Sequence, residues 1–173
     1  MTMMDDKNKA LAQECKRLSE SCQYTSASIY MWLRYLRWIK AIFTAVPLIL
    51  GSLSSWQLLT SSDIEAVRNL IAIFAFLAGL LPSIYAALKF DERLGQYVSA
   101  SGNYKNLEHK FRKLALVDSN KEYEDFEEEF DRAMQDYEQQ NALSLTVPEW
   151  CFKRAQRKVQ SGDYDFDSDQ SEK

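Results

Sequence analysis

Glycine and proline are scarce in this 173-residue chain, which has five glycines and three prolines. Hairpin turns and many-stranded sheets need these residues at their turns, so the scarcity argues against a β-rich fold. We therefore predict an all-α protein. A net charge of -4 and a sequence pI near 5.1 also argue against direct nucleic-acid binding, which requires a broad basic surface.

Residues with catalytic or metal-binding chemistry are equally few. The three cysteines, Cys15, Cys22 and Cys151, form neither a C-x-x-C pair nor a disulfide framework, so we expect reduced, packed thiols. The single histidine, His109, falls on the opposite stripe of its helix from Leu107, so we expect it in solvent. The sequence offers no Ser-His-Asp set and no glycine-rich phosphate loop, so we expect no enzymatic activity, no cofactor and no metal site.

Two long uncharged runs dominate what the sequence does contain. Residues 41–62, AIFTAVPLILGSLSSWQLLTSS, and residues 69–88, NLIAIFAFLAGLLPSIYAAL, contain no Asp, Glu, Lys or Arg. About 20 apolar residues in a helix span a hydrocarbon core of ~30 Å. A helix of this length in a soluble bundle normally keeps a polar face. The two runs predict a transmembrane helical hairpin with a periplasmic loop at 63–68.

Basic residues flank the two runs unevenly. Only Arg68 lies in the connecting loop. Five lie just outside the terminal ends of the runs: Arg34, Arg37, Lys40, Lys89 and Arg93. By the positive-inside rule both termini face the cytoplasm. The polar N-terminus lacks the early apolar segment of a cleavable signal peptide, so we expect the first span itself to direct insertion.

The segments outside the spans carry helical periodicity. Apolar or small residues recur at steps of four and three in residues 1–40, at Leu11, Cys15, Leu18, Cys22, Thr25, Ile29, Trp32 and Leu36. Residues 89–117 repeat the pattern at Phe90, Leu94, Tyr97, Ser101, Tyr104, Leu107, Phe111 and Leu114. This coiled-coil period predicts two helices that face each other in a cytoplasmic stalk. We expect the second span to run without a break into the second of them, with Gly95 and Gly102 as its soft points.

Two shorter helices are expected within residues 118–160. The first, about 121–141, places Tyr123, Phe126, Phe130, Met134 and Tyr137 on one face and carries seven acidic residues between 122 and 131. The second begins in TVPEWCFKRAQRKV, where Thr146 and Glu149 have the spacing of a capping box. Its apolar face is predicted at Phe152, Ala155 and Val159. Its candidates for a partner or membrane surface are Trp150, Lys153, Arg154, Arg157 and Lys158.

Two interpretations of this basic helix remain open. It could lie on the membrane surface, or it could fold back onto the acidic helix before it. The following tail, 161–173, alternates Asp163, Asp165 and Asp167 in the manner of a calcium loop, but Ser168 stands where that loop needs glycine. We expect a disordered acidic tail.

The order of these parts resembles the SLATT family. The resemblance rests on the two closely spaced spans, on ALKFDERLGQY and YKNLEHKFRKLA after the second span, and most sharply on PEWCFKRAQRKVQSGDYDF. SLATT proteins are two-transmembrane effector domains associated with nucleotidyltransferase and SLOG proteins of bacterial conflict systems. The resemblance implies a pore-forming antiphage effector of the bacterial inner membrane, switched on by a separate sensor protein or a nucleotide second messenger.

Two spans alone cannot enclose a lumen, so such a pore requires a homo-oligomer. The second span offers a small-residue packing face at Ala72, Ala75, Gly79, Ser83 and Ala86. Pore-lining candidates in the first span are Thr44, Gly51, Ser52 and Ser55. As the alternative, their hydroxyls only bond backbone carbonyls of their own helix. Candidate hinges are Pro47, Pro82, Lys89 and Gly95.

A competing function is a membrane-anchored adaptor that docks a cytoplasmic partner without conducting. A membrane enzyme is disfavoured, because neither span contains an ionisable residue.

Overall fold

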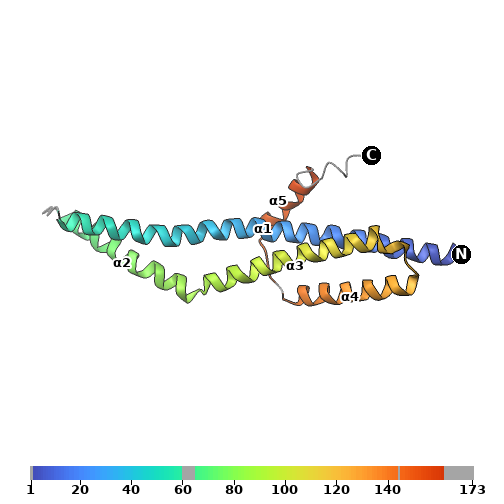
Figure 1. Cartoon of the computed structure of the whole chain (residues 1–173). Helices are drawn as coiled ribbons and strands as arrows, with labels where there is room; N and C mark the ends of the chain where they lie inside the picture. Colours follow the sequence, from blue (N-terminus) through green and yellow to red (C-terminus); the bar gives the residue numbers. More distant parts are fainter. Residues whose placement is uncertain (1, 60–64, 144, 162–173) are drawn as a thin grey trace. The chain divides into compact units, whose positions relative to one another are not determined.

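The computed structural model describes residues 2–59, 65–143 and 145–161, and that part of the chain is helical without a strand (Figure 1). The α-helices are α1 (Thr2–Leu59), α2 (Glu65–Ala87), α3 (Phe90–Leu116), α4 (Tyr123–Ala142) and α5 (Glu149–Gln160), with a short 3-10 helix, η1, at Asp118–Asn120. The all-α prediction is confirmed. The chain divides into two compact units, Met1–Leu33 with Gln96–Lys173, and Arg34–Gly95. Each is described separately.

The core of the first unit lies between α1 and α3. Cys15, Cys22 and Phe111 are fully buried in it. Leu18, Ile29, Tyr104, Leu107 and Leu114 join them with less than a tenth of their surface exposed. These are the residues of the two predicted stripes, because steps of three and four keep side chains on the facing side of each helix. The predicted pairing of the two segments is confirmed, and His109 is exposed as expected.

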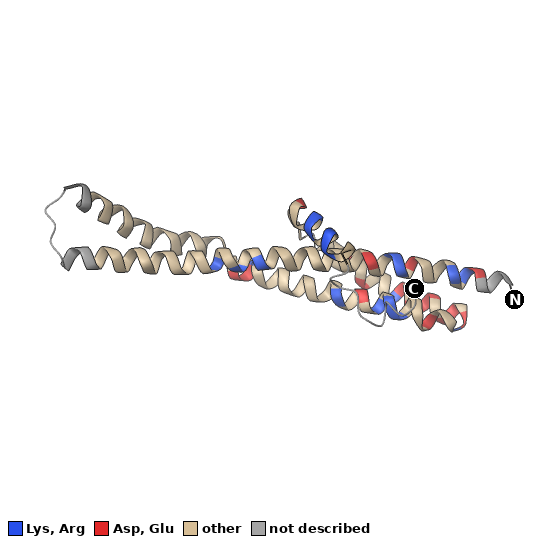
Figure 2. Cartoon of the chain, turned by 90° about the horizontal axis from the view of Figure 1, so that it is seen from above, with Lys and Arg blue, Asp and Glu red and all other residues tan. Residues whose placement is uncertain are grey.

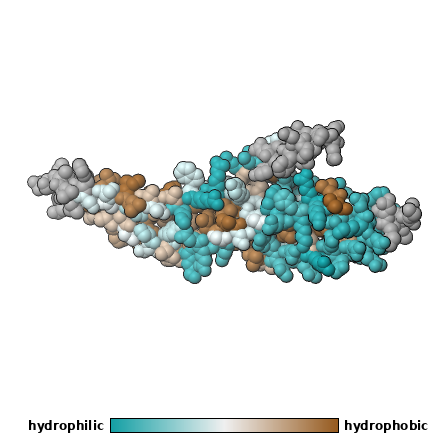
Figure 3. Space-filling view, in the orientation of Figure 1, coloured by the Kyte–Doolittle hydropathy of each residue, from teal (hydrophilic) through white to brown (hydrophobic). Residues whose placement is uncertain are grey.

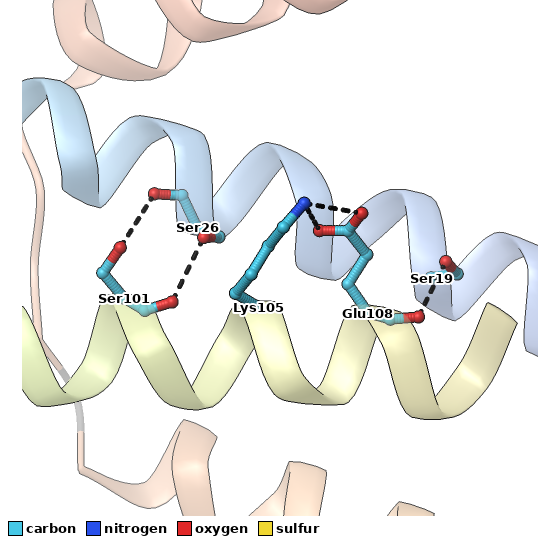
Figure 4. Close-up of polar contacts among 5 residues, drawn as sticks. All are labelled: Ser19, Ser26, Ser101, Lys105 and Glu108. Carbon is cyan, nitrogen blue, oxygen red and sulfur yellow. Dashed lines mark hydrogen bonds and ion pairs between the residues drawn. The ribbon is translucent and has the colours of Figure 1, made fainter. Parts of the chain in front are cut away.

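A polar seam fixes how α1 and α3 meet (Figure 4). The hydroxyl of Ser26 donates to the carbonyl oxygen of Ser101 at 3.1 Å, and the hydroxyl of Ser101 donates back to the carbonyl of Ser26 at 3.5 Å. Two turns further along, Ser19 donates to the carbonyl of Glu108 at 3.2 Å, and the buried Glu108 carboxylate accepts from Lys105 at 2.8 Å. Such bonds require small side chains at the crossing and are satisfied in one register only.

Helix α4 packs its aromatic face against α3. Phe126 is fully buried, and the rings of Phe130 and Tyr137 lie 6.3 and 6.2 Å from that of Phe111. At its C-terminal end Asn141 accepts from the Tyr104 hydroxyl at 2.7 Å. The predicted apolar face of this helix is confirmed, and most of its acidic residues are exposed, whereas Asp136 pairs with Lys110 of α3 at 2.8 Å.

Helix α5 packs on α1, so the prediction that it folds back onto the acidic helix is wrong. The rings of Trp150 and Trp32 meet edge to face at 6.1 Å, and Cys151 and Ala155 are fully buried. Figures 1 and 2 show α5 on the α1 side and α4 on the α3 side of this unit. Burying apolar surface stabilises more than an exposed ion pair does, which favours the site on α1 over the carboxylates of α4.

One finer prediction for α5 fails, and a second holds only in part. The capping box does not form, because the helix begins at Glu149 with Pro148 as its N-cap and without a side-chain cap bond. The carbonyl of Thr146 instead accepts from the Tyr97 hydroxyl at 2.9 Å, which holds this segment in place. Of the predicted apolar face, Ala155 is fully buried and Val159 is half-buried, but Phe152 is 44% exposed and Cys151 is buried in its place.

The second unit contains the end of α1, all of α2 and the start of α3. The predicted unbroken helix from the second run into 89–117 is wrong, because α2 ends at Ala87 and α3 begins at Phe90. Between them Lys89 has a φ of 48°, the one non-glycine residue with positive φ in the described part of the chain. Acidic residues in the first turn of α3 favour a new helix start there, because they complement the helix dipole.

Other predicted boundaries shift or stay outside the described residues. Helix α2 starts at Glu65, so the predicted loop 63–68 is wrong at its last four residues, which include good helix formers. Helices continue through Pro47, Pro82 and Gly95. The side chain of Arg68, residues 60–64 with the first two residues of the predicted loop, and residues 162–173 with nearly all of the predicted tail lie outside what is described.

Candidate functional site

The second unit exposes most of its apolar side chains. Within the apolar stretches of α1 and α2, 11% and 0% of residues are buried, respectively. Leu48 is 70% exposed and Phe76 is 67% exposed. Outside the grey residues, Figure 2 shows no charged residue on α2 or on the stretch of α1 beside it up to a cluster near the start of α3, and Figure 3 shows the hydrophilic surface gathered over the first unit. By length and composition both helices could cross a membrane.

One stripe of large side chains on α2 faces α1, whereas Ile73, Phe76 and Leu80 are exposed. Ile71, Phe74, Leu81 and Tyr85 are half-buried, and the ring of Tyr85 lies 6.2 Å from that of Phe43 in α1. The predicted small-residue face is exposed along its whole length, at Ala72, Ala75, Gly79, Ser83 and Ala86. A Cβ added at Gly79 would meet nothing within 4 Å. The face is therefore open to a second molecule.

The predicted pore-lining hydroxyls bond to their own helix. Thr44 donates to the carbonyl of Lys40 at 3.0 Å, Ser52 to Ile49 at 2.9 Å and Ser55 to Gly51 at 3.0 Å. All three side chains are exposed, whereas Gly51 is half-buried. These bonds match the alternative interpretation, in which the hydroxyls only bond backbone carbonyls of their own helix. Each hydroxyl oxygen still has lone pairs that can accept a hydrogen bond from outside the helix. Ser54, which was not among the predicted pore-lining residues, is the buried serine of this segment.

A charged cluster ties α1 to the first turn of α3. The ammonium of Lys40 donates to Oδ1 of Asp91 at 2.6 Å, and the hydroxyl of Tyr85 donates to the same oxygen at 2.8 Å. The bond from Lys40 lowers the pKa of Asp91, and the same contact raises the pKa of Lys40. The ring of Phe90 lies 5.3 Å from that of Tyr85. The charges of the cluster lie just before the start of the first uncharged run and just after the end of the second. The cluster joins α1 and α2 to the start of α3, next to Lys89.

Sequence reasoning named Lys89 but missed this cluster. A signal was present, because Lys40 directly precedes the first run and Asp91 follows the second by three residues. If the two runs lie antiparallel, these opposite charges come to the same level.

The candidate surface residues of α5 are all exposed apart from the contact of Trp150 with Trp32. Lys153 pairs with Glu149 at 2.7 Å along the helix, and Arg157 donates to the carbonyl of Lys153 at 3.4 Å. Arg154 and Lys158 are exposed on the same helix. This leaves a basic surface on the side of α5 that faces away from α1.

The three cysteines are free and buried, as predicted. Loss of solvation raises the pKa of the Cys15 thiol to about 11 and that of the Cys22 thiol to about 12. Burial also raises the pKa of Cys151. A thiol with so high a pKa is a poor nucleophile and a poor metal ligand near neutral pH. These residues serve the packing of the first unit.

No protein-family model, no curated protein and no solved structure matches this chain. The resemblance to the SLATT family stays a prediction.

Proposed function

We propose that the protein is an integral membrane protein whose two uncharged runs cross the bacterial inner membrane as a hairpin, with both termini in the cytoplasm. One observation carries this proposal: hardly any residue in the apolar stretches of α1 and α2 is buried, and large side chains such as Leu48 and Phe76 are exposed. In water such a surface is unfavourable by about 25 cal/mol for each Å². A bilayer removes this cost, and the charges of Lys40 and Asp91 then lie beside each other where the apolar stretches end.

We further propose that copies of the protein assemble in the membrane and permeabilise it. The outward small-residue face of α2 supports the assembly, because lipid-embedded helices associate through such faces. The exposed hydroxyls of Thr44, Ser52 and Ser55 would supply a mildly polar lining without charge. The resemblance to SLATT effectors supports a role in antiphage defence and a trigger from a separate sensor protein or nucleotide signal.

The topology is tested with a reporter that matures only in the periplasm. Fused after Lys173, the reporter should stay dark. Inserted between Ser62 and Asp63, the same reporter should mature, which serves as the matched control. A signal from the fusion after Lys173 would contradict the proposed orientation.

The effector function is tested by inducing the gene with its genomic neighbours and following a membrane-potential dye. We expect depolarisation only when the trigger is present. Insertion without depolarisation would instead favour the anchored adaptor, which the exposed Trp150 and Phe152 of the first unit would also suit.

A further inference from the structure

Helices α4 and α5 carry opposite charge. Helix α4 contains eight carboxylates and a single arginine. Helix α5 contains two lysines and two arginines against Glu149. Both helices belong to the first unit, and both keep most of their charged groups exposed.

The carboxylates of α4 form a stripe opposite its buried face. Five exposed acidic residues recur at i, i+3, i+4, i+7 and i+14: Glu124, Glu127, Glu128, Asp131 and Glu138. This spacing places them on one side of the helix, away from the buried Phe126 and Ala133. At ~1.5 Å for each residue the stripe is about 21 Å long, and α5 is about 18 Å long. We call it the acidic stripe.

The cations of α5 form a matching surface. Lys153, Arg154 and Arg157 lie on the side away from the buried Cys151 and Ala155, and we call these three residues the basic stripe. Arginine suits such a contact, because its guanidinium can bind a carboxylate through two parallel hydrogen bonds.

The two stripes do not meet within one chain. Helix α5 is held on α1 by the contact of Trp150 with Trp32, whereas α4 is held on α3 by Phe126 and the rings around Phe111. Figures 1 and 2 show the two helices on opposite sides of the α1 and α3 pair. Each molecule therefore presents both halves of a complementary contact in different directions.

We propose that the basic stripe of α5 in one copy docks onto the acidic stripe of α4 in a second copy. The proposal rests on the proposed membrane assembly and names a contact that joins its members outside the bilayer. Because each copy offers one stripe of each kind, the contact is head to tail, and its repetition gives a closed ring or an open chain. Copies held upright in one bilayer are related by rotation about its normal, which favours the ring.

The contact is tested with two charge-reversed variants. The first carries K153E, R154E and R157E, and the second carries E124K, D131K and E138K. Each variant alone places like charges at every such contact, so we expect at least a tenfold fall in copies recovered by a differently tagged copy from a detergent with a neutral head group. Co-expression of the two variants pairs opposite charges again and should restore recovery. K16E, an exposed reversal on α1, should recover as wild type does.

The outcomes separate this contact from its competitors. Oligomers that both variants form alone would overturn the proposal while leaving the proposed function intact. If the first variant loses binding to phosphatidylglycerol vesicles and co-expression fails to restore assembly, the basic stripe binds an anionic bilayer and the proposal is wrong. A wild-type protein recovered only as a monomer would remove this contact and the proposed membrane assembly together.

Discussion

The backbone at Lys89 allows a direct test of the break between α2 and α3. Its φ of 48° lies in the left-handed region, which costs a residue with a Cβ about 1–2 kcal/mol. Glycine adopts this conformation without the steric penalty, and a β-branched residue has a larger penalty there than lysine. We therefore expect K89G to stabilise the break and K89I to favour one continuous helix. The lost contact between Lys89 and Glu92, at 3.4 Å, adds little because both side chains are exposed.

The expected difference between the two variants is about 2 kcal/mol, or roughly 30-fold in the ratio of broken to continuous helix. Backbone amides report this ratio, because the first N–H groups of a helix lack an i-4 carbonyl partner. In a continuous helix the amides of Phe90, Asp91 and Glu92 would bond to the preceding turn and be protected. Hydrogen exchange followed by mass spectrometry, on protein in nanodiscs, measures these amides.

In the wild type we expect the amides of residues 90–92 to exchange at least tenfold faster than those of residues 94–97, which lie inside α3. K89G should keep this fast exchange, and K89I should slow it. The same pair of substitutions at Arg93, inside α3, provides the control. There glycine should loosen the helix by about 1 kcal/mol and isoleucine should change little, the opposite order. Wild-type amides as protected at 90–92 as at 94–97 would refute the break.

Three further predictions follow from the two units. Replacing Gly79 with leucine adds bulk where the chain itself leaves space, so membrane insertion should persist while the crosslinked oligomer is lost. The control I84F, outside the small-residue face, should retain the crosslinked oligomer. An unchanged set of crosslinked bands for the Gly79 variant would mean that the interface lies elsewhere. With pKa values of about 11 and about 12, Cys15 and Cys22 should react with iodoacetamide at pH 8 at least 100-fold more slowly than after unfolding, and equal rates would contradict their burial. A Gly-Ser insertion between Arg37 and Trp38 interrupts the continuous helix α1 and should abolish triggered depolarisation. The same insertion between Phe90 and Asp91, next to the existing break between α2 and α3, should reduce depolarisation less. The reverse order would show that α2 and α3 transmit the trigger.

Local periodicity made the pairing of α1 with α3 in the first unit predictable. Cys15, Leu18 and Cys22 recur at the coiled-coil period, and a helix that buries one stripe needs no distant information to place it. The same holds for the aromatic face of α4. The uncharged runs could also be identified as candidate spans from the sequence, because this identification depends on the composition of about 20 consecutive residues and not on contacts with other segments.

Long-range contacts decided what the sequence did not reveal. No glycine or proline marks the end of α2, so the left-handed residue is a lysine, held by the contacts that Lys40 and Tyr85 make with Asp91. The side on which α5 packs depends on where Trp32, far earlier in the chain, presents its ring to Trp150. Periodicity identifies the apolar face of a helix but not the surface that will cover it.

For the proposed membrane effector, the break at Lys89 changes which helix would carry a signal toward the bilayer. Helix α1 runs unbroken for 58 residues and contains both the stripe that packs on α3 and the first uncharged run. A movement of the first unit can therefore reach that run through continuous hydrogen-bonded backbone, whereas α2 is separated from α3 and follows through the contacts of Asp91 with Lys40 and Tyr85. Pro47 lies inside α1, where its missing N–H removes one backbone bond and permits bending. Bending there would reorient the exposed hydroxyls of α1 while leaving the small-residue face of α2 free to hold neighbouring copies together.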